Sequence, residues 1–124
     1  MSFDWKNYLH LAEHLPATTC RGGVEARLRT SISRAYYAVF CQARNNLLSE
    51  GKSLSGMDQH QSVIAMLHES GDGLKRKIAT ELGRLRRNRN KADYDDDIDN
   101  VAFMQQVSMT WAASIQKDLQ QAWK

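Results

Sequence analysis

A run of basic residues that follows Leu85 turns within a few positions into a run of acidic residues, and one arginine in it lies out of place. The apolar residues that lead into this run repeat at three- and four-residue steps, at Leu74, Ile78, Leu82 and Leu85. The next steps reach Arg89 and Ala92. A guanidinium in such a core-facing position is costly to bury unless it has an acceptor or opens on a cleft. Asp93, four residues further along the same helix face, can be that acceptor. The pair is therefore either a structural strut or an arginine positioned to bind phosphate.

The predicted helix that contains Arg89 spans about residues 74–92 and carries far more basic than acidic side chains. Lysine and arginine at this density attract a phosphate backbone, and arginine can bind phosphate through two parallel hydrogen bonds. The alternative is a solvated face that only neutralises the acidic turn beyond it. The candidates for RNA or phosphate binding on this helix are Arg84, Arg86, Arg87 and Lys91.

A second arginine, Arg34, lies at the entrance to an apolar segment, residues 35–41, of another predicted helix. Tyr37 follows Arg34 by three residues and shares its flank. If this helix packs beside the one that carries Arg89 and Asp93, the four side chains converge. We predict that convergence, with Arg34 as a phosphate-binding candidate and Tyr37 in a supporting role.

His60 opens a short predicted helix and could act as a general base, although a histidine at a helix start is also a common structural residue. His10 and His14 lie one turn apart, but no cysteine or carboxylate set completes a metal site around them. The sequence contains no phosphate-binding loop, no nucleophile elbow and no metalloprotease motif. We therefore expect no metal and no cofactor.

Helical periodicity over long stretches, with a single proline at Pro16, predicts an all-α fold. The second helix would be about 40 Å long. Its middle is apolar on every side, so it is either the central helix or has an extra face that meets another subunit. We predict one domain, residues 1–124, built as an antiparallel bundle of about five helices around a long central second helix. The expected helices span about residues 2–14, 23–50, 58–69 and 74–92, with a Gly/Ser loop at 51–56 and a fifth helix capped by Asp96 or Asp97.

The chain has 124 residues, which suits one domain with one hydrophobic core. A net charge of +3 and a pI near 9.0 favour anionic partners. Cys20 and Cys41 form no disulfide or metal pattern, and Cys41 lies among apolar residues as a buried small hydrophobe would. No apolar run approaches the roughly 18–20 residues that span a bilayer, and the N-terminus does not resemble a signal peptide. We expect a cytoplasmic protein without membrane contact.

Three blocks taken together resemble the HEPN domain family, in its small single-domain prokaryotic branch with an Arg-x-x-Ala-Asp-Tyr ending. They are the segment 33–40, the isolated His60 and the segment 85–94, and the resemblance runs from about Val24 to the fifth helix. It implies an antiparallel helical bundle that commonly forms a homodimer. It also implies a setting among toxin–antitoxin, antiviral or RNA-processing modules, often beside a minimal nucleotidyltransferase as partner.

Many members of that family are metal-independent endoribonucleases. Their motif is an arginine, a polar residue and a histidine four to six residues beyond the arginine. The arginine stabilises phosphate charge and the histidine helps to activate the ribose 2′-hydroxyl. Arginine–asparagine pairs begin here at Arg87 and Arg89, but Asp93 or Tyr94 stands where the histidine belongs. The catalytic candidates that the resemblance implies are Arg89, Asp93 and Tyr94, with His60 as a substitute from another helix.

Three functions fit the sequence, and whether the chain is an enzyme stays open. The first is a HEPN protein of a toxin or defence module that cleaves RNA through a non-standard site or only binds it. The second is a non-enzymatic dimeric helical module that binds a partner protein, with Arg34, Arg89 and Asp93 as internal struts. The third is a nucleotide binder whose basic cleft holds a small phosphorylated ligand.

Overall fold

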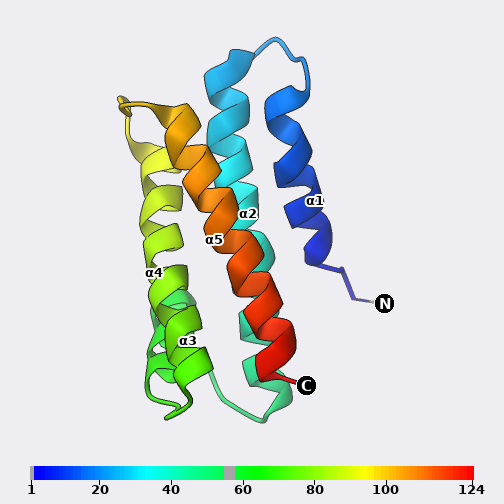
Figure 1. Cartoon of the computed structure of the whole chain (residues 1–124), viewed down its shortest axis with the longest axis vertical. Coiled ribbons are helices and arrows are strands. Elements are labelled where there is room, and N and C mark those ends of the chain that lie inside the picture. The colour runs from blue at the N-terminus through cyan, green and yellow to red at the C-terminus, as the bar shows by residue number, and fades with distance from the viewer. Residues whose placement is uncertain (1, 55–57) are drawn as a thin grey trace.

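The computed structural model describes residues 2–54 and 58–124, and this part of the chain is helical without strands (Figure 1). This confirms the predicted all-α class. The elements, in order, are α1 (Lys6–His14), a 3₁₀ turn η1 (Leu15–Ala17), α2 (Gly23–Ser49), α3 (Gln59–His68), α4 (Gly73–Tyr94) and α5 (Val101–Ala122).

The long helix α2 lies at the centre of the bundle, where it packs against α1, α4 and α5 (Figure 1). Three packed pairs run antiparallel, namely α1 with α2, α2 with α4 and α4 with α5. The short α3 packs mainly on α4. The predicted antiparallel bundle with a long central second helix is therefore present, and α2 is central because its apolar middle meets helices on several sides.

The middle of α2 supplies the largest share of the core. Tyr36 and Val39 are fully buried there, and Cys41 is buried as the sequence predicts. Burial raises the pKa of the Cys41 thiol. Val24, which continues the same periodic stripe toward the start of the helix, is 59% exposed. Periodicity sets the direction of a side chain but not whether a neighbour covers it, so the buried stripe begins one turn later, at Leu28.

The start of α5 differs from the prediction. Asp96 and Asp97 do not cap it, because the helix begins at Val101 and its N-cap is Asn100. The Asn100 side chain accepts a hydrogen bond from the backbone N–H of Phe103 at 3.2 Å. Asn100 adopts a left-handed conformation with φ of 50°, which asparagine tolerates better than most residues. The acidic residues therefore precede the helix and none lies in its first turn.

Arg29 of α2 gives the physical reason for that late start. Its guanidinium donates to the backbone oxygens of Ala92, Asp95 and Asp96 at 3.1, 2.6 and 3.2 Å. These bonds satisfy carbonyls at the end of α4 and hold the chain beyond it outside the helical conformation. The acidic segment after Tyr94 is consequently a loop attached to the central helix.

The remaining boundaries lie close to the expected ones. α1 begins at Lys6 rather than near position 2, and α4 continues past position 92 to Tyr94. Asp58 caps α3 by accepting from the backbone N–H of Gln61 at 3.2 Å. Positions 55 and 56 of the predicted Gly/Ser loop lie outside the described residues. None of the helices in the described ranges has the length and apolar character that crossing a bilayer requires.

Candidate functional site

The misplaced arginine of α4 meets the central helix. Arg89 donates through Nη2 to the Tyr37 hydroxyl at 2.5 Å and through Nη1 to Asn90 Oδ1 at 2.9 Å. Its Nε lies 2.9 Å from Asp93 Oδ2, the acceptor that the sequence predicts. That Nε–H is not aligned for a hydrogen bond, so the contact with Asp93 is an ion pair held by charge. The Arg89 side chain is only 14% exposed, so most of its polar atoms are occupied inside the protein.

The second predicted arginine joins the same cluster. The guanidinium of Arg34 lies 5.1 Å from the centre of the Tyr37 ring, and that of Arg89 lies 4.9 Å from it. Ser33 links the two helices further, because it accepts from Arg34 Nη2 at 3.2 Å and donates to Asp93 Oδ2 at 3.4 Å. The predicted convergence of Arg34, Tyr37, Arg89 and Asp93 is therefore present in the structure.

His60 lies beside this cluster although it comes from α3. The Tyr36 hydroxyl and His60 Nδ1 are 2.6 Å apart, and the imidazole stacks on Phe40 with ring centres 4.2 Å apart. Burial, and then the positive charges of Arg86 and Arg89, lower the pKa of His60. Burial raises the pKa of Tyr36 far above its ordinary range. At neutral pH both rings are therefore uncharged, in a site surrounded by arginines.

Arg86 connects the cluster to solvent. Its Nη2 donates to Asp58 Oδ2 at 2.9 Å, and this hydrogen bond is the main reason why the pKa of Asp58 is lowered. The Arg86 side chain is 27% exposed. It borders an open depression of about 310 Å³ between α3 and α4, whose other lining residues are Gln61, Ile64, Gly83, Arg87 and Asn90.

The remaining candidates lie outside this cluster. Tyr94 is 74% exposed, and no hydrogen bond or ring contact joins it to Arg89 in the described part of the chain. His14 Nδ1 bonds to the backbone oxygen of His10 at 2.8 Å, and no group of three or more metal-binding side chains exists among residues 2–54 and 58–124. Three further candidates are exposed on α4: Arg84, Arg87 and Lys91.

Three residues that organise the site are not predicted from the sequence, namely Ser33, Tyr36 and Asp58. Ser33 and Tyr36 stand on either side of Arg34, so their position in the 33–40 segment was the available signal. In the sequence Asp58 has only the pattern of an ordinary residue at a helix start. Its contact with Arg86 joins residues 28 positions apart, so no local pattern indicates it. Pairs of that kind become visible only when α3 is placed on α4.

The environment of His60 makes the native state sensitive to acid. The pKa of His60 is lowered below the ordinary 6.5, so the unfolded chain takes up the proton first as the pH falls. The contribution of the uncharged His60 to stability is therefore fully present above about pH 6.5 and decreases as the pH falls further. We expect the free energy of unfolding, measured with urea between about pH 8 and pH 5, to fall less steeply in His60→Gln than in the wild type.

The control for this prediction is His68→Gln, which changes an exposed histidine at the other end of α3. It should leave the slope unchanged. Equal slopes in the wild type and in His60→Gln would contradict the role assigned to the buried imidazole.

Comparisons of this chain with known protein families, with curated proteins and with solved structures find no match. A function is therefore inferred from the chemistry of the cluster. Arg34, Arg86 and Arg89 concentrate positive charge next to two tyrosines and one uncharged imidazole. Such a set can hold an anion and orient it, and phosphate is the anion that arginine forks match best.

Proposed function

We propose that this chain binds RNA as a HEPN-type protein of a prokaryotic toxin–antitoxin or antiviral module. The observation that carries the proposal is the basic face of α4. Arg86 borders the open depression beside α3 and is anchored by Asp58. Arg87 lines the same depression and shares one face of α4 with the exposed Arg84 and Lys91.

The shape of this surface supports a polymer as ligand. Cations that bind a phosphate backbone must stay accessible, and the exposed arginines of α4 meet that requirement better than the enclosed Arg89. The depression of about 310 Å³ is open, so a strand can continue beyond it. The third function considered, a small phosphorylated ligand held in the basic cleft, would leave the exposed Arg84 and Lys91 outside the depression without a phosphate partner.

The arrangement supports binding more than cleavage. The cleavage motif that the HEPN resemblance implies needs an arginine and a histidine free to reach one phosphate. Here Asp93 is paired with Arg89, Tyr94 points away into solvent, and Nδ1 of His60 is engaged by Tyr36. We therefore propose that the chain retains the arginine contacts with RNA and lacks efficient ribonuclease activity.

The test is incubation of the purified chain with RNA, followed by separate assays of binding and cleavage. We expect the wild type to bind RNA and to leave it intact, and His60→Ala to do the same. Cleavage by the wild type that is lost in both His60→Ala and Arg89→Ala would contradict this prediction. It would instead establish a nuclease whose histidine comes from α3 rather than α4.

A second function is favoured by the enclosure of Arg89. Its side chain is 14% exposed and contacts Tyr37, Asn90 and Asp93, which is the arrangement expected of a structural strut. The corresponding proposal is a non-enzymatic homodimeric helical module that binds a partner protein such as a minimal nucleotidyltransferase. Absence of salt-dependent RNA binding by the purified chain would favour this function over the first.

A further inference from the structure

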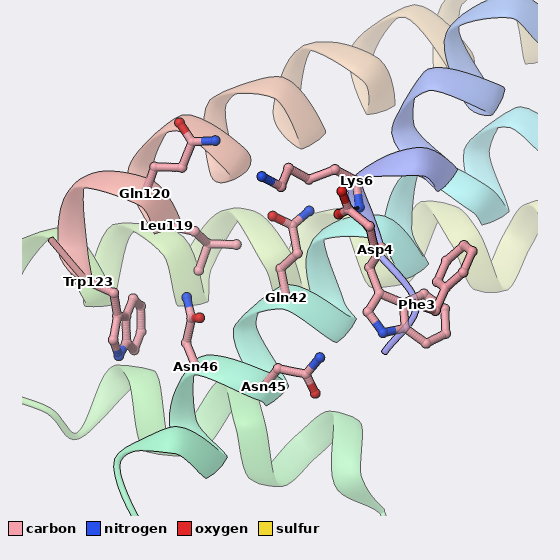
Figure 2. Close-up of a pocket in the computed structure, with 10 residues that line it drawn as sticks. Phe3, Asp4, Lys6, Gln42, Asn45, Asn46, Leu119, Gln120 and Trp123 are labelled. Carbon is pink, nitrogen blue, oxygen red and sulfur yellow. Dashed lines mark hydrogen bonds between the residues drawn. The ribbon is translucent and has the colours of Figure 1, made fainter. Parts of the chain in front are cut away.

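A separate groove lies between α2, α5 and the segment that precedes α1 (Figure 2). Its volume is about 330 Å³, at the lower end of the range for small-molecule sites. None of the arginines of the α2–α4 cluster lines it. Its walls carry several amide side chains, with aromatic residues toward its two ends.

The amides on the α2 side are oriented by the protein. Gln42 donates through Nε2 to the backbone oxygen of Ala38 and to Gln116 Oε1, both at 2.9 Å. Its own Oε1 therefore remains an acceptor. Asn45 Oδ1 accepts from Arg44 Nε at 3.1 Å, which leaves the Asn45 amide nitrogen as a donor. The groove thus presents both a fixed acceptor and a donor.

Two more amides complete the polar lining. Asn46 on α2 and Gln120 on α5 border the groove, and neither side chain is paired with another described residue (Figure 2). The charged residues of the lining, Asp4 and Lys6, offset each other, and the Asp4 carboxylate already accepts from the Lys6 backbone N–H at 3.1 Å. An uncharged ligand with donor and acceptor edges suits this lining better than a phosphate.

An aromatic wall is held in place at one end. The indole N–H of Trp123 donates to the Glu50 carboxylate, and the ammonium of Lys75 lies 4.4 Å from the centre of the indole ring. Trp123 borders the groove at the end opposite Phe3 (Figure 2). A ring fixed in this way can stack on a planar ligand without a large loss of side-chain entropy.

We propose that this groove binds the adenine base of a nucleoside or nucleotide. Gln42 Oε1 accepts from the exocyclic amine, an amide nitrogen of Asn46 or Gln120 donates to a ring nitrogen, and Trp123 stacks on the base. In base recognition one amide side chain commonly accepts from the adenine amine and donates to a ring nitrogen, and this groove offers the same two contacts from separate side chains. In a base with a carbonyl in place of the amine, the carbonyl oxygen faces Gln42 Oε1. Both atoms are acceptors, so no hydrogen bond forms between them.

The experiment is a ligand-observed NMR titration of the whole chain with adenosine and with inosine, which differ in that one group. We expect saturable binding of adenosine and roughly tenfold weaker binding of inosine. Asn46→Ala and Gln120→Ala should each weaken adenosine binding, because both remove a donor that borders the groove. Gln106→Ala, which removes an exposed amide of α5 outside the groove, is the matched control and should bind as the wild type does.

Several results would overturn the proposal. They are equal affinity for adenosine and inosine, equal binding of adenosine and ribose, no binding at millimolar adenosine, or no effect of the two amide variants.

A comparison of adenosine monophosphate with a short oligoadenylate shows whether the base belongs to a free nucleotide or to a nucleic-acid strand. Tighter binding of the oligomer that depends on Asn46 assigns the groove to a base within a strand, and equal binding assigns it to a free nucleotide. No residue of α4 lines the groove, so this proposal can fail or succeed independently of the RNA-binding function.

Discussion

Replacement of Arg89 by alanine is expected to lower the free energy of unfolding by about 3 kcal/mol. The change removes the hydrogen bond to the Tyr37 hydroxyl and leaves the Asp93 carboxylate without its cation. Asp93 is 27% exposed and recovers some hydration, so the loss stays at the low end for a broken buried pair. Urea unfolding at neutral pH, followed by circular dichroism, measures the difference.

Two further variants sharpen this prediction. Arg87→Ala removes an exposed arginine two residues away and should change stability by less than about 0.5 kcal/mol. Arg89→Lys keeps the charge but loses the planar fork, so its stability should lie between those of the wild type and Arg89→Ala. Unchanged stability of Arg89→Ala together with loss of RNA binding would make Arg89 a ligand contact rather than a strut.

The second large effect concerns the exposed basic face of α4. We expect the triple variant Arg84→Ala, Arg87→Ala and Lys91→Ala to bind RNA roughly 100-fold more weakly than the wild type at low salt. Each cation that binds a phosphate releases counterions, so the plot of log affinity against log salt should become shallower by about one for each phosphate-binding cation that is removed. Fluorescence anisotropy with labelled RNA at several salt concentrations gives both quantities.

The matched control for this experiment is Lys117→Ala, which removes an exposed cation from α5 instead of α4. It should leave the affinity and the salt dependence close to those of the wild type. An equal loss in the control would mean that only the total charge matters. Binding that does not change in the triple variant would remove the α4 face from the proposed RNA contact.

Most of the fold follows from the sequence because the helices carry strong apolar periodicity. The central place of α2 is predictable from its uniformly apolar middle. The start of α5 is not, because Arg29 looks like half of a local surface pair with Glu25. Its contacts with carbonyls more than sixty positions away depend on how α2 and α4 pack.

Part of the candidate site was also predictable from the periodicity of the helices. Arg89 and Asp93 share one helix face, so periodicity places them together, and the paired packing of α2 with α4 adds Arg34 and Tyr37. The approach of His60 could not be predicted from periodicity. It depends on the packing of α3, which lays the imidazole against Phe40.

The contact between Tyr36 and His60 determines which tautomer the imidazole adopts. Tyr36 is fully buried, and the described residues give its hydroxyl no other hydrogen-bond partner. The hydroxyl must therefore donate its proton to Nδ1, since a buried O–H without an acceptor is costly. The neutral ring then carries its hydrogen on Nε2. Toward any ligand that reaches it, His60 acts as a hydrogen-bond donor, which suits an anionic oxygen and opposes removal of a proton from a hydroxyl.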